Sequence, residues 1–144
     1  MATPIQVVFD CADPARLSAF WAEALGYKRQ DPPTGFGSWE EFLTFQGVPQ
    51  EEWNSARAVV DPEGVGPRIF FQRVPEAKAV KNRVHLDVNA GGGHDTSPEE
   101  RQRRMEAAVE RLAVAGAAKV EARERWGQRW VVMQDPEGNE FCVQ

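Results

Sequence analysis

The sequence contains little cysteine and no excess of positive charge. Its two cysteines, Cys11 and Cys142, do not have the spacing of a zinc site. The formal net charge of −5 at pH 7 argues against a nucleic-acid partner, which would need a basic face. Residues 1–5 lack the features of a secretion signal, and no apolar run is long enough to span a membrane. We therefore expect a cytoplasmic protein with reduced thiols and no membrane partner.

A tetrapeptide that occurs twice is the strongest signal in the chain. Asp61-Pro62-Glu63-Gly64 lies between the apolar segments Ala58–Val60 and Ile69–Gln72, and Asp135-Pro136-Glu137-Gly138 follows Trp130–Met133. Proline fixes one φ angle of a turn, glycine accepts a positive φ, and the aspartate can accept hydrogen bonds from the turn's own backbone. Two strand–turn–strand units in one chain indicate an internal duplication.

The segment before the first turn predicts a strand followed by a helix. Residues Ile5–Cys11 alternate between apolar and polar side chains, as in a half-buried strand. Asp13 and Pro14 then form a helix start, with aspartate as the N-cap and proline at the first helical position. Gly26 is the expected C-cap of this helix.

The second half begins with the same pattern. Arg83–Asn89 alternates like a strand, Ser97-Pro98 resembles a helix start, and Gly116 a helix end. Between them, Gly91–Gly93 has neither of the common phosphate-binding patterns, so we interpret it as a flexible loop. We expect His94 in this loop to be exposed to solvent.

Each half therefore predicts the order strand–helix–strand–strand–strand. The strands are too short and too close for parallel crossovers, so we expect an α+β fold with mixed, mostly antiparallel sheets. We predict one domain over residues 1–144, with module one at 1–77 and module two at 78–144. A helix would cover one face of each sheet, and the other faces would curve into a trough that suits a ligand.

Residues 31–54 are not explained by the duplication. Ser38–Glu41 has the pattern of a helix capping box, which predicts a short inserted helix. The segment contains the large apolar side chains Trp39, Phe42 and Trp53. These either hold a surface excursion together or belong to a lid over a cavity, in which case they bind ligand.

Several segments resemble the vicinal oxygen chelate superfamily, which includes glyoxalase I, bleomycin-resistance proteins, extradiol dioxygenases and fosfomycin-resistance enzymes. The chain is most similar to bacterial glyoxalase-like proteins. The resemblance rests on the repeated strand–helix–strand–strand–strand unit and on the following segments: Phe9–Pro14, Phe20-Trp21, Leu25–Tyr27, Lys81–Asp87 and Asn139–Cys142. It implies the tandem βαβββ fold and a homodimer.

The resemblance also implies a site on the open faces of the sheets. Enzymes of this superfamily hold a divalent metal there, which polarises vicinal oxygens of the substrate as a Lewis acid. The corresponding positions in this chain are Gln6, Gln72, His85 and Cys142. Relatives that bind metal usually have glutamate in place of Cys142. By strand alternation Glu140 faces the same side, and Asp87 and Asp10 do so as well, as candidates for a general acid or base.

This residue set brings no carboxylate to the four positions. Amide oxygens are poor ligands, and a thiol must lose its proton before it binds a metal. We therefore expect a polar cluster that lines a pocket without a cofactor. The alternative is a Zn, Ni, Mn or Fe site with Gln6, His85 and Cys142 as candidate ligands.

Three functions remain open on this basis. The first is a protein that binds a small aromatic or amphipathic molecule in the trough. The second is a lyase, isomerase or dioxygenase of the glyoxalase type, metal-dependent if the candidate ligands hold an ion. The third is a non-catalytic module that binds another protein. The aromatic residues of 31–54 and the missing carboxylate favour the first.

Overall fold

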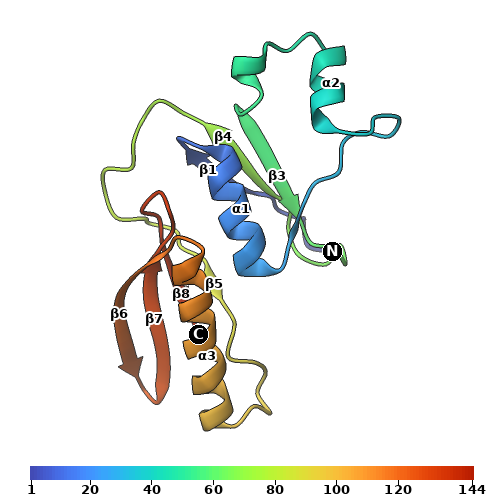
Figure 1. The fold of residues 1–144 in the computed structure, drawn as a ribbon. Helices are drawn as coiled ribbons and strands as arrows, with labels where there is room; N and C mark the ends of the chain where they lie inside the picture. The colour runs from blue at the N-terminus through green and yellow to red at the C-terminus, as the bar shows by residue number, and fades with distance from the viewer. The chain divides into compact units, whose positions relative to one another are not determined.

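A computed structural model describes residues 1–144 (Figure 1). In it the chain forms two compact units. The first unit comprises residues 1–22 and 26–77, and the second comprises 23–25 and 78–144. Each unit contains one four-stranded mixed sheet. None of the helices is both long and apolar enough to cross a lipid bilayer.

The first sheet has the strand order β1-β4-β3-β2, in which β1 and β4 are parallel and the other pairs are antiparallel. The elements that build this βαβββ unit are β1 (Val7–Cys11), α1 (Pro14–Leu25), β2 (Lys28–Arg29), β3 (Ala56–Val60) and β4 (Ile69–Arg73). Between β2 and β3 lie α2 (Trp39–Phe45) and the short 3-10 helix η1 (Gln50–Glu52).

The second sheet repeats this pattern with the order β5-β8-β7-β6, again with one parallel pair, β5 with β8. Its elements are β5 (Asp87–Val88), α3 (Pro98–Val114), β6 (Ala118–Arg125), β7 (Gln128–Gln134) and β8 (Glu140–Val143). The predicted α+β class and the repeated βαβββ order are therefore confirmed.

Helices α1 and α3 begin as the sequence predicts. The Asp13 carboxylate accepts a hydrogen bond from the Arg16 N–H, and the Ser97 hydroxyl accepts one from the Glu100 N–H. A proline follows each cap, where its missing N–H costs nothing. The caps fix where the helices begin, and the apolar faces that follow are buried against the sheets.

The two repeated turns share two hydrogen bonds. The glycine N–H donates to the aspartate carbonyl in both, over 3.0 Å at Gly64 and 2.9 Å at Gly138. The side chains of Asp61 and Asp135 each accept the N–H of the glutamate two positions later, both over 2.9 Å. The turn is therefore duplicated in its geometry as well as in its sequence.

The core of each unit lies between its helix and one face of its sheet. In the first unit the most deeply buried side chains include Leu17, Trp21, Ile69 and Phe71. In the second they include Leu112, Met133, Phe141 and Val143. The Trp21 ring of α1 lies 5.1 Å from the Phe9 ring of β1, which joins the helix to its sheet.

The predicted strand over Arg83–Asn89 is shorter in the structure. Only Asp87 and Val88 pair with β8, opposite Cys142 and Val143. Because β8 begins at Glu140, residues before 85 have no strand beside them. Val84 is accordingly exposed instead of alternating into the core.

The inserted segment 31–54 is held together by its own side chains. Phe36 contacts Phe42 and Phe45, with ring centroids 5.1 Å and 5.3 Å apart, and Trp39 lies 5.9 Å from Phe42. The Trp39 indole N–H donates to the Gln30 carbonyl, which ties α2 to the end of β2. No residue of α2 is buried, so this cluster is a small one near the surface.

Candidate functional site

One face of the second sheet is buried with α3, and the other face, which we call the open face, carries the candidate site. Phe141 and Val143 of β8 point into the core, while Glu140 and Cys142 alternate to the open face. The neighbouring strand β7 adds Val132, which pairs with Cys142.

A cavity of ≈ 370 Å³ lies on the open face, and we call it the sheet-face cavity. Its size falls in the lower part of the range for small-molecule sites. It is lined by Lys81, His85, Asp87, Arg123, Gln128, Trp130, Val132, Glu140, Phe141, Cys142 and Gln144. The lining combines an aromatic ring, a thiol, an imidazole and charges of both signs.

His85, Asp87 and Cys142 form a compact cluster in this cavity. One ligand atom from each residue lies within 4.8 Å of the others, and His85 Nε2 is 3.3 Å from the Asp87 carboxylate. Imidazole, carboxylate and thiolate are the three ligand types that Zn²⁺ uses in proteins. The donor set therefore fits a divalent metal and makes the cluster a candidate metal site.

The cavity keeps the Cys142 thiol protonated. Burial raises the pKa of Cys142, and the negative charge of Asp87 raises it further, while Lys81 and Arg123 oppose this shift. At neutral pH the thiol is therefore neutral, and it would have to lose a proton to bind a cation. An arriving cation supplies positive charge that favours this loss.

Glu140 faces the cavity but already has partners. Its carboxylate accepts the Asn82 N–H over 3.0 Å and forms an ion pair with Lys78 at 3.2 Å. The Asn82 hydrogen bond, followed by the Lys78 contacts, lowers the pKa of Glu140. Glu140 thus fixes the segment that precedes β5, and its predicted contact with a ligand stays a prediction.

The predicted site residues of the first unit are also engaged. Gln6 Oε1 accepts a hydrogen bond from Arg68 over 2.6 Å, and Gln72 Nε2 donates to Asp10 over 2.7 Å. Because Gln6 belongs to the first unit, its joint use with His85 and Cys142 as metal ligands stays a prediction.

The register of the strands corrects one equivalence drawn from the sequence. Cys142 pairs with Val132, which lies three residues before the second turn, and Phe70 pairs with Ala58, three before the first. Phe70, and not Gln72, therefore occupies the position of Cys142. The chain between turn and strand is two residues longer in the first unit, since Phe70 is nine positions after Asp61 and Cys142 seven after Asp135.

The aromatic residues predicted to bind ligand lie in the inserted segment. Trp39 and Phe42 contact each other, and the Trp53 indole N–H donates to the Val48 carbonyl over 2.9 Å. None of the three lines the sheet-face cavity. Their role in a lid stays a prediction.

Sequence reasoning underestimated Asp87. It placed this residue on the open face as a candidate acid or base, but not beside His85 and Cys142 as a third ligand. The available signal was the His85-x-Asp87 spacing, because residues two apart on a strand point to the same side. Arg123 and Trp130 gave no such signal, since their places in the lining depend on the register of β6 and β7, and Lys81 gave none because it lies in the irregular segment before β5.

Comparisons with known proteins agree with this architecture. A glyoxalase/bleomycin resistance/dioxygenase family enzyme from Burkholderia phytofirmans is 17% identical, with a TM-score of 0.58 over 96% of this chain and 94% of its own. A possible glyoxalase from Bacillus cereus is 12% identical, with a TM-score of 0.60 over 100% and 99%. At these identities the likeness concerns the fold. No curated protein sequence matches the chain.

A third similar structure is of a fosfomycin-resistance protein. It is a mutant of FosX from Listeria monocytogenes in complex with Mn(II) and 1S,2S-dihydroxypropylphosphonic acid. FosX is 10% identical to this chain, with a TM-score of 0.63 over 100% of this chain and 92% of its own. The sequence itself matches the model of the glyoxalase-like domain over residues 6–144. This match over almost the whole chain, with its two βαβββ units, shows that the protein belongs to the glyoxalase-like domain family of the vicinal oxygen chelate superfamily.

Proposed function

We propose that the protein binds a small aromatic or amphipathic organic molecule in the sheet-face cavity. The observation that carries this proposal is the lining itself, where Trp130 and Val132 stand beside the polar cluster of His85, Asp87 and Cys142. A pocket with an apolar wall and a few convergent polar groups is the usual form of a small-molecule site.

The lining suggests how such a molecule is oriented. The Trp130 ring offers a flat apolar surface, which favours stacking with an aromatic ligand. Lys81 and Arg123 line the cavity as cations, and Asp87 and Glu140 as anions, of which Glu140 is paired with Lys78. Because Arg123 is already paired with Glu121, Lys81 is the better partner for an anionic group of the ligand. An aromatic ring that carries a carboxylate would use both features.

A titration with 2-naphthoate tests this proposal. Backbone amide NMR signals of the full chain are followed, and we expect the largest shifts at Asp87, Val132 and Cys142. Trp130→Ala should weaken binding about tenfold because the stacking surface is lost. The matched control is Trp126→Ala, since Trp126 lies on the same hairpin but lines none of the cavities described here.

Two results would contradict the proposal. One is the absence of shifts around Val132 and Cys142 at any soluble concentration of 2-naphthoate. The other is equal affinity of the Trp130→Ala and Trp126→Ala variants, with both folded by circular dichroism. Either result would mean that the open face does not bind this class of molecule.

The His85–Asp87–Cys142 cluster favours a second candidate, a metal-dependent lyase, isomerase or dioxygenase. These three residues would hold the ion, and a bound divalent metal would supply Lewis-acid polarisation of ligand oxygens. The Mn(II) in the FosX complex supports this candidate by analogy of fold alone. The protein's own part would be to place the ligand against Trp130 while Glu140 holds the preceding segment in place.

Zn²⁺ and Mn²⁺ titrations by calorimetry test the second candidate. We expect Cys142→Ser to weaken Zn²⁺ binding by more than the roughly 10–100-fold that is typical when an outer partner of a ligand is lost. Cys11→Ser is the matched control, because Cys11 is the other buried thiol and lies in the first unit. Equal Zn²⁺ affinity of the two variants would exclude the cluster as a metal site.

The resemblance to the family adds two proposals about assembly. We expect residues 1–144 to unfold as one domain, in a single calorimetric transition, and we expect a homodimer. Light scattering after gel filtration measures the second directly. A mass close to the 16.1 kDa of one chain would contradict the homodimer.

A further inference from the structure

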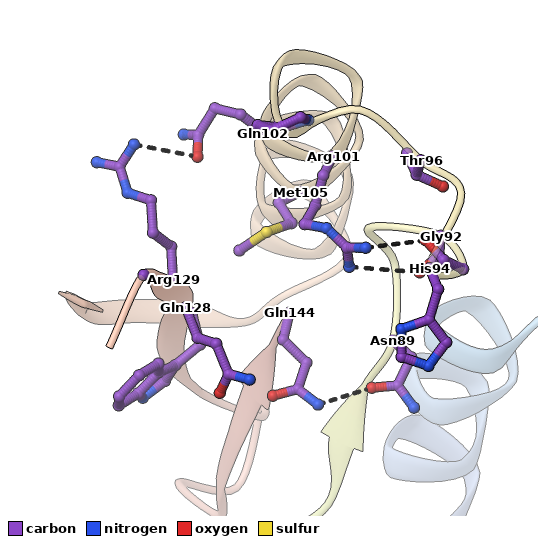
Figure 2. A pocket seen from close by; sticks show the side chains of 14 residues that line it. Asn89, Gly92, His94, Thr96, Arg101, Gln102, Met105, Gln128, Arg129 and Gln144 are labelled. Atoms are coloured by element: carbon purple, nitrogen blue, oxygen red, sulfur yellow. Dashed lines mark hydrogen bonds between the residues drawn. The ribbon is translucent and has the colours of Figure 1, made fainter. Parts of the chain in front are cut away.

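A second and larger cavity lies in the same unit as the sheet-face cavity. It has a volume of ≈ 650 Å³, and we call it the glycine-loop cavity. Figure 2 shows it between the first turns of α3, the Gly91–Gly93 loop and the end of the β6–β7 hairpin. Its lining consists of Asn89, Gly92, Gly93, His94, Thr96, Pro98, Arg101, Gln102, Met105, Gly127, Gln128, Arg129, Trp130 and Gln144.

Residues Gly91–Gly93, which we call the glycine loop, pack against other residues of the cavity lining. Gly91 is buried, and its N–H donates to the Gln144 carbonyl over 2.8 Å. A Cβ atom on Gly91 would lie 2.7 Å from Arg101 Cγ. One on Gly92 would lie 2.5 Å from the Thr96 hydroxyl, at a φ of +93°. Side chains at these positions would collide with the wall, which explains why the loop needs glycine.

Arg101 holds the loop in place. Its guanidinium donates to the carbonyls of Gly92, over 3.4 Å, and Gly93, over 2.9 Å (Figure 2). Two bonds from one planar group fix both the position and the plane of the loop. The interpretation of Gly91–Gly93 as a flexible loop therefore misses its fixed contacts, which come from Arg101 of α3, nine residues after Gly92 and eight after Gly93.

The charge of the glycine-loop cavity is opposite to that of the whole chain. Its lining contains Arg101 and Arg129 but no aspartate or glutamate, although the protein carries a formal net charge of −5. A cavity that gathers cations in an acidic protein selects against cationic ligands and attracts anionic ones.

Arg129 is the cation that can turn to a ligand. Its Nη1 lies 3.3 Å from Gln102 Oε1, and its Nε lies 3.4 Å from the Glu124 carboxylate. Both contacts are long, and the Arg129 side chain is 59% exposed. Exposed pairs of this kind are weak, so the guanidinium loses little when it moves to a bound anion. Arg101, which has two carbonyl partners, is not free in this way.

We propose that the glycine-loop cavity is a second ligand site, for a small organic oxyanion, namely a phosphate monoester or a carboxylate. Arg129 contacts the oxyanion, and Arg101 acts as a positioning residue that keeps the glycine loop in place. Met105 and Trp130 provide an apolar wall for the rest of the molecule. The site stands apart from the proposed function, because it does not use His85, Asp87 or Cys142.

The glycine-loop cavity and the sheet-face cavity share part of their lining. Gln128, Trp130 and Gln144 border both. Changes at these three residues would affect both sites and could not separate them. Arg129 and the glycine loop border the glycine-loop cavity but not the sheet-face cavity, so the test rests on them.

The experiment is an NMR titration of the full chain with three probes, namely inorganic phosphate, phenyl phosphate and benzoate. We expect shifts of the Gly92, Gly93 and His94 amides and of the Arg129 Nε–H signal. Phenyl phosphate should bind more tightly than inorganic phosphate because its ring contacts the apolar wall. Comparison of phenyl phosphate with benzoate then tells which oxyanion the cavity prefers.

A pair of arginine variants makes the test specific. Arg129→Gln should weaken binding of phenyl phosphate about tenfold, since a charge-assisted fork is lost. Arg103→Gln removes the same charge from an exposed position of α3 that does not line the cavity, and it should change the affinity less than about twofold. Arg129→Lys keeps the charge but not the fork, and should fall between the two.

Three outcomes would overturn the proposal. They are shifts confined to His85, Asp87 and Cys142, equal weakening by Arg129→Gln and Arg103→Gln, and no saturable shift with any of the three probes. None of them decides the proposed function, because 2-naphthoate binding on the open face is read at Val132 and Cys142. Loss of 2-naphthoate binding alone would leave this site standing.

Discussion

Phe70 in the first sheet and Cys142 in the second occupy the same place in the repeated unit. Each pairs with the residue three positions before the aspartate of its turn. Their parallel partners are Val8 and Asp87 respectively. At one and the same pair of positions, the first unit thus has two apolar side chains and the second has a carboxylate beside a thiol.

On the sides of the sheets that face the helices, the equivalent residues do not differ in chemistry between the two units. Ile69 and Phe71 in the first unit and Phe141 and Val143 in the second are all fully buried and apolar. The comparison teaches that the buried positions preserve the shape of the unit, while the open-face positions can change chemistry without changing the fold. The cluster of His85, Asp87 and Cys142 accordingly lies in the second unit.

The largest predicted effect concerns the two helices. Trp21 and Met105 are equivalent, since each lies seven residues after the first proline of its helix. Both are buried. We expect Trp21→Ala to cost about 3–5 kcal/mol of unfolding free energy and Met105→Ala about 2 kcal/mol. Met105 borders the glycine-loop cavity, so solvent and neighbouring side chains can fill the space that the shorter alanine leaves. Urea denaturation of both variants measures the difference.

Equal costs would weaken the comparison. They would mean that α3 is packed as tightly as α1 and that the space around Met105 closes in solution. Val114→Ala serves as a control for both variants, because Val114 is 91% exposed and should change the stability by only a few tenths of a kcal/mol.

The positions of Trp21 and Met105 illustrate what could be predicted from the sequence. Each helix was identified from its cap, its proline and its apolar spacing, which are local signals. The repeated turn added the order of the strands, because a duplicated unit must fold twice in the same way. The short β5 was not foreseen, since its length depends on where β8 begins.

A medium effect is predicted at the two helix caps. Asp13→Ala and Ser97→Ala should each cost about 1 kcal/mol at pH 7, because both side chains cap an N–H of the first turn. The two should differ in their dependence on pH. A hydrogen bond from Asn54 and then the Arg16 N–H lower the pKa of Asp13 below its usual value of 3.8.

The sign of this pH dependence follows from the direction of the shift. A carboxyl group with a lowered pKa in the folded state adds stability above pH 3.8, and this is lost as the pH falls through the lower folded value. The cost of Asp13→Ala should therefore shrink below about pH 4, while that of Ser97→Ala should not. Urea midpoints from pH 7 to pH 3 test this, and parallel curves for the two variants would contradict it.

The smallest predicted effect concerns the hairpin between β6 and β7. Trp126 is the one residue other than glycine with a positive φ, at 52°, whereas all such positions of the first unit are glycine. Strain of a non-glycine residue there costs about 1–2 kcal/mol. The Arg125 guanidinium lies 4.1 Å from the Trp126 ring centre, and at an exposed site such a contact returns about 0.5–1 kcal/mol.

Trp126→Asn should therefore stabilise the protein by about 0.5–1 kcal/mol, because asparagine suits this turn. The rise of the urea midpoint measures it. Arg125→Gln, which removes only the ring contact, should lower the midpoint slightly. A loss of stability in Trp126→Asn would show that the tryptophan makes a contact worth more than its backbone strain.

The candidate site could be predicted only in part, for a reason visible in Gln72. The resemblance to the family placed Gln72 at the position of Cys142, but the pairing of β4 with β3 puts Phe70 there instead. His85 and Cys142 lie far apart in the sequence, and their proximity depends on the parallel pairing of β5 with β8. Residue types can be read from a sequence, while register across a sheet is set by loop lengths and packing.

The most direct test of the account compares the two open faces in one experiment. Amide shifts are recorded across the whole chain during titration with 2-naphthoate, and those at Asp87 and Cys142 are compared with those at Val8 and Phe70. We expect the largest shifts at Asp87 and Cys142, and we expect them to saturate with a single affinity. Shifts centred on Val8 and Phe70, with none at Asp87 and Cys142, would contradict it.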